Sequence, residues 1–428
     1  MTTPYQERED QLQRLASLSC DHLVRGEFGI GEQVAREFLE LAKDASDDWH
    51  SLAQLRLGTI LENAGRYQEA LSCAQAAQDV YSPTDGGWYH AAGLIGNIML
   101  NQGDYDSART QFLSVLERWP DYSFALCSLA GVESKLGNTD SSHRYALRAL
   151  ESAGKADDRE HMSVAHNLLG DAELDLENRD QAEKHFRNAL AISEEISRRR
   201  GISIACQRLS EIEYDGNNYA ASLEFGRRAV NAEIEMGRVC NVTDALWRAL
   251  KGPRKSTNPE VISDAISLCH TALEVVKEPA EKVWILRSEA WFHRDLKQFQ
   301  HAEKSLDQAL GFLEESDEEY ARINGMVGIL KQGQGFLNEA KASFLGAVEL
   351  AERHGHRRAK LSAYRSLGYL TNDTGDTFQA RRYWRRALQL AQDVGDTEAV
   401  EHLKETLEIY QPNLFSWFRS KLPWRRNR

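Results

Sequence analysis

Histidines and cysteines are the residues of this chain that could bind a metal or act as nucleophiles, and their spacing favours neither chemistry. His161 and His166 are five residues apart, and His354 and His356 flank a single glycine. Two ligands on one helix are usually three or four residues apart, and no cysteine or carboxylate completes a set beside either pair. We therefore expect solvated or helix-capping histidines, with no metal and no cofactor.

Sequence motifs of common enzymes are also missing. The chain contains no GxxxxGK[ST], no HExxH and no GxSxG. The segment GIGEQV at Gly29–Val34 lacks both the third glycine and the preceding strand of a nucleotide-binding loop. Carboxylates are abundant, but on helices they mostly form solvated faces and i,i+4 pairs such as Glu183 with Arg187. We predict that the chain is not an enzyme; an active site here would have to be of a kind without a recognised motif.

The size and charge of the chain limit its architecture and its partners. A chain of 428 residues is too long for one hydrophobic core, so two or three domains or an array of repeats are expected. The formal charge is −13, and the first 410 residues carry −18 because the last eighteen hold five cations and no carboxylate. A surface this acidic repels phosphate backbones, so we expect no nucleic-acid partner.

Targeting features are not evident in the sequence. The first ten residues, MTTPYQERED, lack the cationic and apolar regions of a secretion signal. The longest apolar run, Ala91–Leu100, is well short of the roughly eighteen residues that span a bilayer. The six cysteines are scattered without a CxxC pair, which is typical of free thiols in a reducing compartment. We expect a cytoplasmic protein that is at most peripherally associated with a membrane.

Helical periodicity runs through nearly the whole chain. Apolar residues recur three and four positions apart, helix-favouring residues dominate, and no proline occurs between Pro120 and Pro253. Gly-Asn, Gly-Asp and Asn-Arg pairs interrupt this pattern at regular intervals, where helices are expected to end and turn.

A longer repeat is superimposed on the helical pattern. An aliphatic residue followed by glycine recurs at Leu57-Gly58, Ile95-Gly96, Leu169-Gly170, Val327-Gly328 and Leu367-Gly368. An alanine follows each glycine at a fixed offset, at Ala70, Ala108, Ala182, Ala340 and Ala380. An aromatic residue follows four of these alanines, at Phe112, Phe186, Phe344 and Trp384. Small residues at these positions let two helices approach closely, and the aromatic rings fill the space toward the next unit.

This pattern resembles the tetratricopeptide repeat (TPR), in a variant whose period is about 40 residues. The resemblance covers nearly the whole chain, with repeats starting near residues 12, 51, 89, 123, 163, 203, 243, 283, 321 and 361. It implies an all-α fold, a right-handed α-solenoid of about ten helix–turn–helix units. The amphipathic segment Asp396–Tyr410 is expected to be a C-terminal capping helix.

The predicted organisation follows from this register. It comprises a degenerate helical repeat at 1–45, a TPR array at 46–250, a loop and candidate hinge at 251–260, a continued array at 261–395, the capping helix at 396–410 and a basic aromatic tail at 411–428.

The TPR resemblance also implies a concave groove lined by the first helix of each unit. The side chains expected there become cationic and aromatic toward the C-terminal repeats, and they are Asn167, Asp171, Asp175, Gln207, Glu211, Asp215, Trp284, Arg287, Trp291, Arg294, Arg365 and Tyr369. Trp284 and Trp291 share one helix face, either as core residues or as an anchor for a partner peptide.

One well-known TPR ligand mode is disfavoured by the residues in this groove. TPR domains that clamp the terminal carboxylates of chaperones use lysine and asparagine at set inward positions. Those positions hold Leu55 and Thr59, Gly93 and Asn97, and Cys127 and Gly131, so only Asn97 matches. We do not expect a chaperone adaptor of that kind.

The tail combines aromatic and cationic residues after the acidic body. Its most prominent side chains are Phe415, Trp417, Phe418, Trp424, Arg425 and Arg426. Three interpretations remain open: packing onto the acidic body, anchoring to an anionic membrane surface, or a linear motif for another protein.

The sequence thus predicts a non-enzymatic scaffold that binds a protein or peptide in its concave groove. One alternative is a regulatory sensor whose superhelix closes on a peptide. Another is an assembly factor held at a membrane surface by the tail. The sequence does not specify the partner or the oligomeric state.

Overall fold

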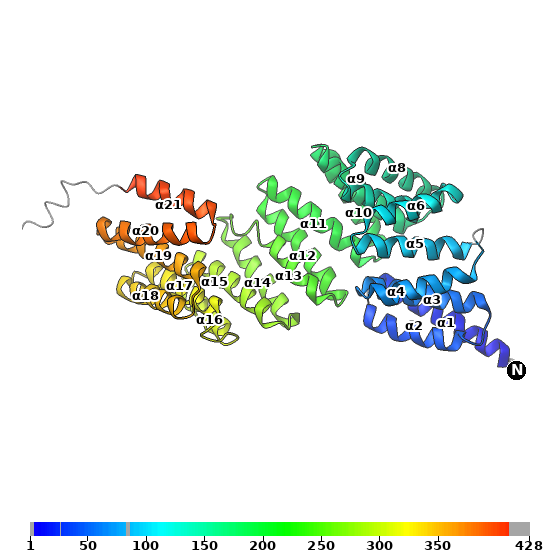
Figure 1. Ribbon diagram of the computed structural model, residues 1–428, viewed down its shortest axis with the longest axis horizontal. Coiled ribbons are helices and arrows are strands. Elements are labelled where there is room, and N and C mark those ends of the chain that lie inside the picture. The colour runs from blue at the N-terminus through cyan, green and yellow to red at the C-terminus, as the bar shows by residue number, and fades with distance from the viewer. Residues whose placement is uncertain (1–3, 26, 83–85, 411–428) are drawn as a thin grey trace, which may run out of the picture. The chain divides into compact units, whose positions relative to one another are not determined.

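The computed structural model describes residues 4–25, 27–82 and 86–410, and every regular element in them is an α-helix. The chain divides into two compact units, Met1–Ser256 and Thr257–Arg428, called here the N-terminal and C-terminal units. In both, consecutive helices pack as antiparallel hairpins, and the hairpins stack in chain order (Figure 1). The predicted all-α solenoid is confirmed.

The N-terminal unit contains six hairpins followed by one further helix in the described residues. The helices are α1 (Pro4–Arg25), α2 (Phe28–Ala42), α3 (Asp47–Asn63), α4 (Tyr67–Val80), α5 (Gly86–Asn101), α6 (Tyr105–Arg118), α7 (Ser123–Lys135), α8 (Thr139–Lys155), α9 (Arg159–Asp175), α10 (Arg179–Glu195), α11 (Arg199–Asp215), α12 (Tyr219–Glu235) and α13 (Val239–Ala249).

The C-terminal unit begins with one helix, continues with three hairpins and ends its described part with a single helix. The helices are α14 (Pro259–Val275), α15 (Pro279–Asp295), α16 (Phe299–Leu310), α17 (Glu318–Gly333), α18 (Leu337–Arg353), α19 (Arg357–Asp373), α20 (Thr377–Asp393) and α21 (Thr397–Ile409). Every predicted repeat start lies within the first helix of a repeat, and the seventh repeat is the one divided between the units.

The turns within and between hairpins follow from local sequence. In the α5–α6 turn, Gly103 has a positive φ of 84°, and the Asp104 side chain accepts a hydrogen bond from the Ser107 N–H at 3.2 Å. Glycine adopts that backbone conformation without a steric penalty, and the aspartate satisfies a free amide of the helix start. The predicted helix ends at Gly-Asp pairs are therefore confirmed.

Contact between glycine and an aromatic ring joins the two helices of several hairpins. A Cβ atom on Gly96 would lie 2.7 Å from the Phe112 ring, and one on Gly170 would lie 2.6 Å from the Phe186 ring. Both rings are fully buried. Since real Cβ atoms do not approach that closely, only glycine allows each ring to lie between its two helices.

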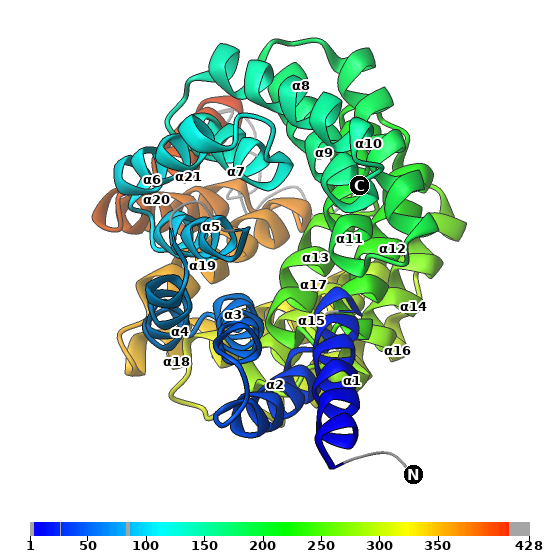
Figure 2. The same cartoon turned by 90° about the vertical axis from the view of Figure 1, so that its right-hand side faces the viewer.

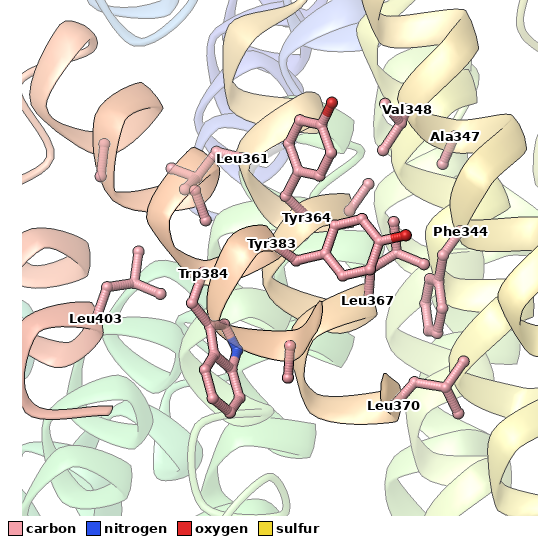
Figure 3. Close-up of a cluster of buried hydrophobic side chains, with 14 of the residues drawn as sticks. Phe344, Ala347, Val348, Leu361, Tyr364, Leu367, Leu370, Tyr383, Trp384 and Leu403 are labelled. Carbon is pink, nitrogen blue, oxygen red and sulfur yellow. The ribbon is translucent and has the colours of Figure 1, made fainter. Parts of the chain in front are cut away.

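The core of the C-terminal unit ends at the predicted capping helix. Trp384 projects from α20 into a cluster that contains Leu367 of α19 and Leu403 of α21 (Figure 3). Ala399 and Leu403 of α21 are buried, whereas its four glutamates are exposed. The helix therefore covers the apolar face of the last hairpin, as a terminal cap must.

In the N-terminal unit, polar contacts join helices that are far apart in the sequence. The chain of this unit curves from α1 to α13 (Figure 2), and the start of α11 contacts the end of α3. The Arg200 guanidinium donates a 2.7 Å hydrogen bond to the Asn63 side-chain oxygen, and Arg199 lies 4.0 Å from Glu27. These four residues, together with Glu62, are called the clasp below.

The segment between α13 and α14 is compact over its first half. Gly252 and Pro253 are buried, and the Lys255 amine lies 4.8 Å from the Tyr214 ring centroid. The boundary between the two units falls directly afterwards, at Ser256. The tail residues for which three interpretations were left open lie outside the described residues. None of the described helices combines the length and apolarity needed to span a bilayer.

Candidate partner-binding groove

The first helices of successive hairpins form the inner layer of each unit. In the C-terminal unit, α15 contacts α17 and α17 contacts α19, without an intervening second helix. In the N-terminal unit the same relation joins α7 to α9 and α9 to α11. Side chains on the free face of these first helices therefore share one surface, which is where the predicted groove residues were placed.

A pocket of about 170 Å³ opens on this surface of the C-terminal unit. Three consecutive first helices supply its walls. The lining residues are Arg287, Trp291, Ala321, Arg322, Gly325, Met326, Ile329, Ala359, Ser362, Ala363, Arg365 and Ser366.

The pocket exists because small residues occupy the middle of its walls. Ala321 and Gly325 are one helical turn apart on α17, and Ala359 and Ala363 are one turn apart on α19. A Cβ atom added to Gly325 would have no neighbour within 4 Å. This glycine is therefore not required by packing, unlike Gly96 and Gly170, and its missing side chain leaves the pocket open.

Aromatic and apolar side chains form one side of the pocket. Trp291 is half-buried and packs against the core of the α15–α17 region, which includes Met326. The guanidinium of Arg294 stacks over the Trp291 ring at 3.9 Å from its centroid. Trp291 is thus a core residue that also lines the pocket.

Three arginines approach the pocket, and two are neutralised by neighbouring carboxylates. Glu319 forms ion pairs with Arg287 and, at 2.6 Å, with Arg322. Glu318 lies 3.1 Å from Arg322. Arg365 is exposed and forms no hydrogen bond, ion pair or ring contact with any residue that the structure describes. One positive charge therefore remains available at this surface.

The other predicted residues of the C-terminal groove have different surroundings. Arg294 also pairs with Asp295 at 2.5 Å, and Trp284 is half-buried on α15 outside the pocket lining. The Tyr369 hydroxyl lies 2.9 Å from His402 and 3.3 Å from Thr406, both on the capping helix. The structure thus brings Arg287, Trp291 and Arg365 together and places Tyr369 under α21.

The acidic groove residues of the N-terminal unit form a chain of ion pairs with arginines. Arg208 lies 2.8 Å from Asp171 and 3.2 Å from Glu211. Arg248 binds the other oxygen of Glu211 at 2.7 Å. Burial raises the pKa of Asp171, and the charge of Arg208 opposes that shift. This stretch of the groove is therefore largely neutralised from within the unit.

The remaining predicted residues of this groove range from buried to exposed. Asn167 is 6% exposed, and its side-chain oxygen has no hydrogen-bond partner among the described residues. The Gln207 amide donates to Ser203 at 3.1 Å, while Asp175 and Asp215 remain exposed.

Arg208 and Arg248 were missed by the sequence prediction, although a signal existed. Each lies 37 positions after the carboxylate it pairs with, Asp171 and Glu211 respectively. A repeat of about 40 residues brings such positions to adjacent first helices, so the spacing could have identified both pairs.

The histidines adopt two environments. His161 lies 2.6 Å from Asp158, the N-cap residue of α9, so its ring contacts the capping side chain and does not itself cap the helix. His166 is half-buried and lies 3.0 Å from His185, and burial lowers its pKa to about 4. The expectation of a solvated or capping histidine was therefore wrong for His166, which joins α9 to α10 in neutral form. Within the described residues no group of three or more histidines, cysteines or carboxylates is arranged to hold a metal.

Comparison with known proteins identifies the class. Residues 94–122 and 164–196 each match the tetratricopeptide repeat family. Together with the stacked hairpins, these matches show that the chain contains tetratricopeptide repeats. Arrays of this kind present extended concave surfaces that bind other proteins.

Solved structures with similar folds include three from different contexts. A signal transduction ATPase (STAND) protein with a tetratricopeptide repeat sensor from Pyrococcus horikoshii aligns at a TM-score of 0.48 and 17% identity, over 87% of this chain and 56% of that one. This chain therefore spans little more than half the length of that protein.

A Rap protein complexed with competence and sporulation factor aligns at 0.43 and 14% identity, over 87% of this chain and 100% of that one. Pseudomonas aeruginosa pilF aligns at 0.39 and 13% identity, over 53% and 92% of the two chains. A comparison with curated proteins finds no match.

Proposed function

We propose that this chain is a non-enzymatic scaffold that binds a protein or peptide partner through the inner surface of its C-terminal unit. The observation that supports this most is the pocket walled by α15, α17 and α19. It combines an aromatic side chain, small residues that leave space, and an arginine without a partner among the described residues. Aromatic residues and arginine are the types that most often dominate interface energetics.

The pocket has the size and position expected for holding one side chain of a partner. A dry cavity of about 150 Å³ can bind benzene, so 170 Å³ accommodates an aromatic ring or a branched aliphatic side chain. The hydroxyls of Ser362 and Ser366 form no hydrogen bonds with described residues and can bind the backbone of an extended peptide.

A glycine substitution tests this proposal with little risk to the fold. Gly325→Leu would place a side chain in the pocket, and its Cβ atom would meet no other atom within 4 Å. The matched control is Gly346→Leu on α18, where an added Cβ also meets nothing within 4 Å and the pocket is not involved. Both variants carry the same substitution within a helix, so they should unfold at similar temperatures.

The binding assay uses a displayed library of random peptides of about twelve residues, long enough to cross three repeats when extended. Peptides are selected on the full-length protein, and their affinity is measured by fluorescence anisotropy. We expect Gly325→Leu to weaken binding at least about tenfold and Gly346→Leu to leave it unchanged. Equal affinity for both variants, or no selected peptide, would overturn the proposal.

A second candidate is a sensor whose array closes on a bound peptide. The observation that favours it is the division into two units at Ser256, inside the candidate hinge at 251–260. Because Gly252, Pro253 and Lys255 are held against the N-terminal unit, we propose that such a hinge would lie after Lys255. X-ray scattering with and without a selected peptide tests this, since an unchanged radius of gyration would contradict closure.

A further inference from the structure

We propose that the pocket selects a peptide segment in which a carboxylate side chain lies close to a bulky apolar one. Arg365 would bind the carboxylate, and the apolar side chain would fill the space beside Gly325 and Trp291. This inference rests on the proposed function, since it specifies what the same pocket binds.

The charge requirement follows from the ion pairs around the pocket. Arg287 and Arg322 share Glu319, and Arg322 also contacts Glu318, so these four groups balance one another. Arg365 adds a positive charge that no described residue pairs with. One carboxylate on the ligand would restore neutrality at this surface.

The identity of the cation also matters. The planar guanidinium of arginine presents two parallel N–H groups that match the geometry of a carboxylate, which makes such hydrogen bonds short and directional. Because Arg365 is exposed, its guanidinium is accessible to a ligand. We therefore assign Arg365 as the residue that determines charge specificity.

The apolar requirement follows from the opposite wall. Trp291, Met326 and Ile329 present carbon surface to the pocket, and Ala321, Ala359 and Ala363 keep it open. A polar side chain of the ligand would lose its water there without gaining a partner. A ring or branched aliphatic side chain fills the space and buries apolar area instead.

These features argue against the chain's own tail as the occupant. The tail supplies suitable aromatic side chains, but its side chains include five cations and no carboxylate. Those cations would add to the unbalanced positive charge of Arg365, and like charges at an interface are unfavourable. The occupant is therefore a segment of another protein.

A charge exchange tests the inference on the full-length protein. The random peptide library is selected in parallel on the wild type, on Arg365→Glu and on Arg385→Glu. Arg385 is an exposed arginine on α20 outside the pocket, so its replacement makes the same charge change elsewhere. Thermal unfolding confirms that each variant is folded.

We expect the wild type and Arg385→Glu to select aspartate or glutamate within a few positions of a bulky apolar residue. Arg365→Glu should bind these peptides about tenfold more weakly at low ionic strength, and peptides with lysine in place of the acid should recover affinity on it. Selected peptides that show no acidic preference, or that bind Arg365→Glu as well as the wild type, would overturn the inference.

The two proposals fail in distinguishable ways. If peptides lose affinity for Gly325→Leu but not for Arg365→Glu, the pocket binds a partner and the charge assignment is wrong. If the wild type selects no peptide, both the proposed function and this inference fail.

Discussion

The inner surfaces of the two units differ in how their charges are satisfied. In the N-terminal unit, Asp171 and Glu211 are paired with Arg208 and Arg248, so these two carboxylates are balanced within the unit, while Asp175 and Asp215 remain exposed. In the C-terminal unit, Arg365 has no partner among the described residues.

Glycine has two roles in these units. Gly96 and Gly170 in the N-terminal unit, and Gly328 and Gly368 in the C-terminal unit, are required because a ring lies against them. Gly325 in the C-terminal unit faces open space. One repeat fold thus supports an inner surface whose groups serve stability and another whose groups are available to a ligand.

The clasp extends this contrast. Glu62 is 6% exposed, burial raises its pKa, and its carboxylate accepts a 2.8 Å hydrogen bond from Asn63. Asn63 in turn accepts from Arg200 at 2.7 Å. The polar groups at this end of the N-terminal unit are therefore also engaged with one another rather than presented to a partner.

The largest expected effect is a loss of stability when a glycine that packs against a ring is replaced, and this packing occurs in both units. We expect Gly170→Leu in the N-terminal unit and Gly368→Leu in the C-terminal unit each to cost about 1–3 kcal/mol, because the new side chain overlaps Phe186 or Trp384. Urea unfolding measures both, with Gly346→Leu as the control. If one variant unfolds at the wild-type midpoint, the units do not share this packing.

A smaller effect distinguishes the inner surfaces. Arg208→Ala leaves Asp171 and Glu211 without their shared cation and should cost about 1 kcal/mol, a modest value because the arginine is 37% exposed. Arg365→Ala removes a cation with no described partner and should change stability by less than about 0.5 kcal/mol. Thermal unfolding compares the stability of the two variants. Equal losses of stability would show that the two inner surfaces do not differ in this way.

Much of the fold could be predicted because its determinants are local and repeated. Gly170 and Phe186 occupy fixed positions in one hairpin, so their contact follows from the register of the repeat. The capping helix could be predicted because Ala399 and Leu403 lie on one face of a helix whose other faces are charged.

The parts that could not be predicted depend on distance along the chain. Arg200 and Asn63 are 137 residues apart, and their contact depends on how sharply the hairpins between α3 and α11 curve. Tyr369 is on the predicted inner helix, yet its hydroxyl is engaged by the capping helix. Gly325 resembles any other helical glycine in the sequence, and only the positions of α15 and α19 show that it faces open space.

Gly325 also allows a substitution that should stabilise the protein. Alanine has a higher helix propensity than glycine, and an added methyl here meets no atom within 4 Å. We expect Gly325→Ala to raise the free energy of unfolding by about 0.5–1 kcal/mol. A loss of stability in urea unfolding would show that this glycine is structural, like those in the N-terminal unit.

The smallest expected effect is a pH dependence in the C-terminal unit. His293 is buried beside Glu289, at 3.4 Å, and Gln298, at 2.7 Å. Burial disfavours its charged form, but the hydrogen bonds and the Glu289 charge outweigh burial and raise the pKa of His293 above its ordinary value of 6.5.

A histidine with a raised pKa stabilises the folded state below pH 6.5, and this contribution is lost as the pH rises through its folded pKa. The stability difference between the wild type and His293→Gln should therefore be larger at about pH 6 than at about pH 8. Denaturant unfolding at both pH values measures it, and an equal or reversed difference would contradict the assignment.

Photo-crosslinking locates a bound peptide most directly. A benzophenone amino acid is placed singly at three exposed positions of the full-length protein: Ser362 in the pocket, Asp175 on the inner surface of the N-terminal unit, and Arg385 on α20. With a labelled peptide selected on the wild type, we expect crosslinking from position 362 and only background from positions 175 and 385. Stronger crosslinking from 175 or 385 than from 362 would show that the partner binds elsewhere.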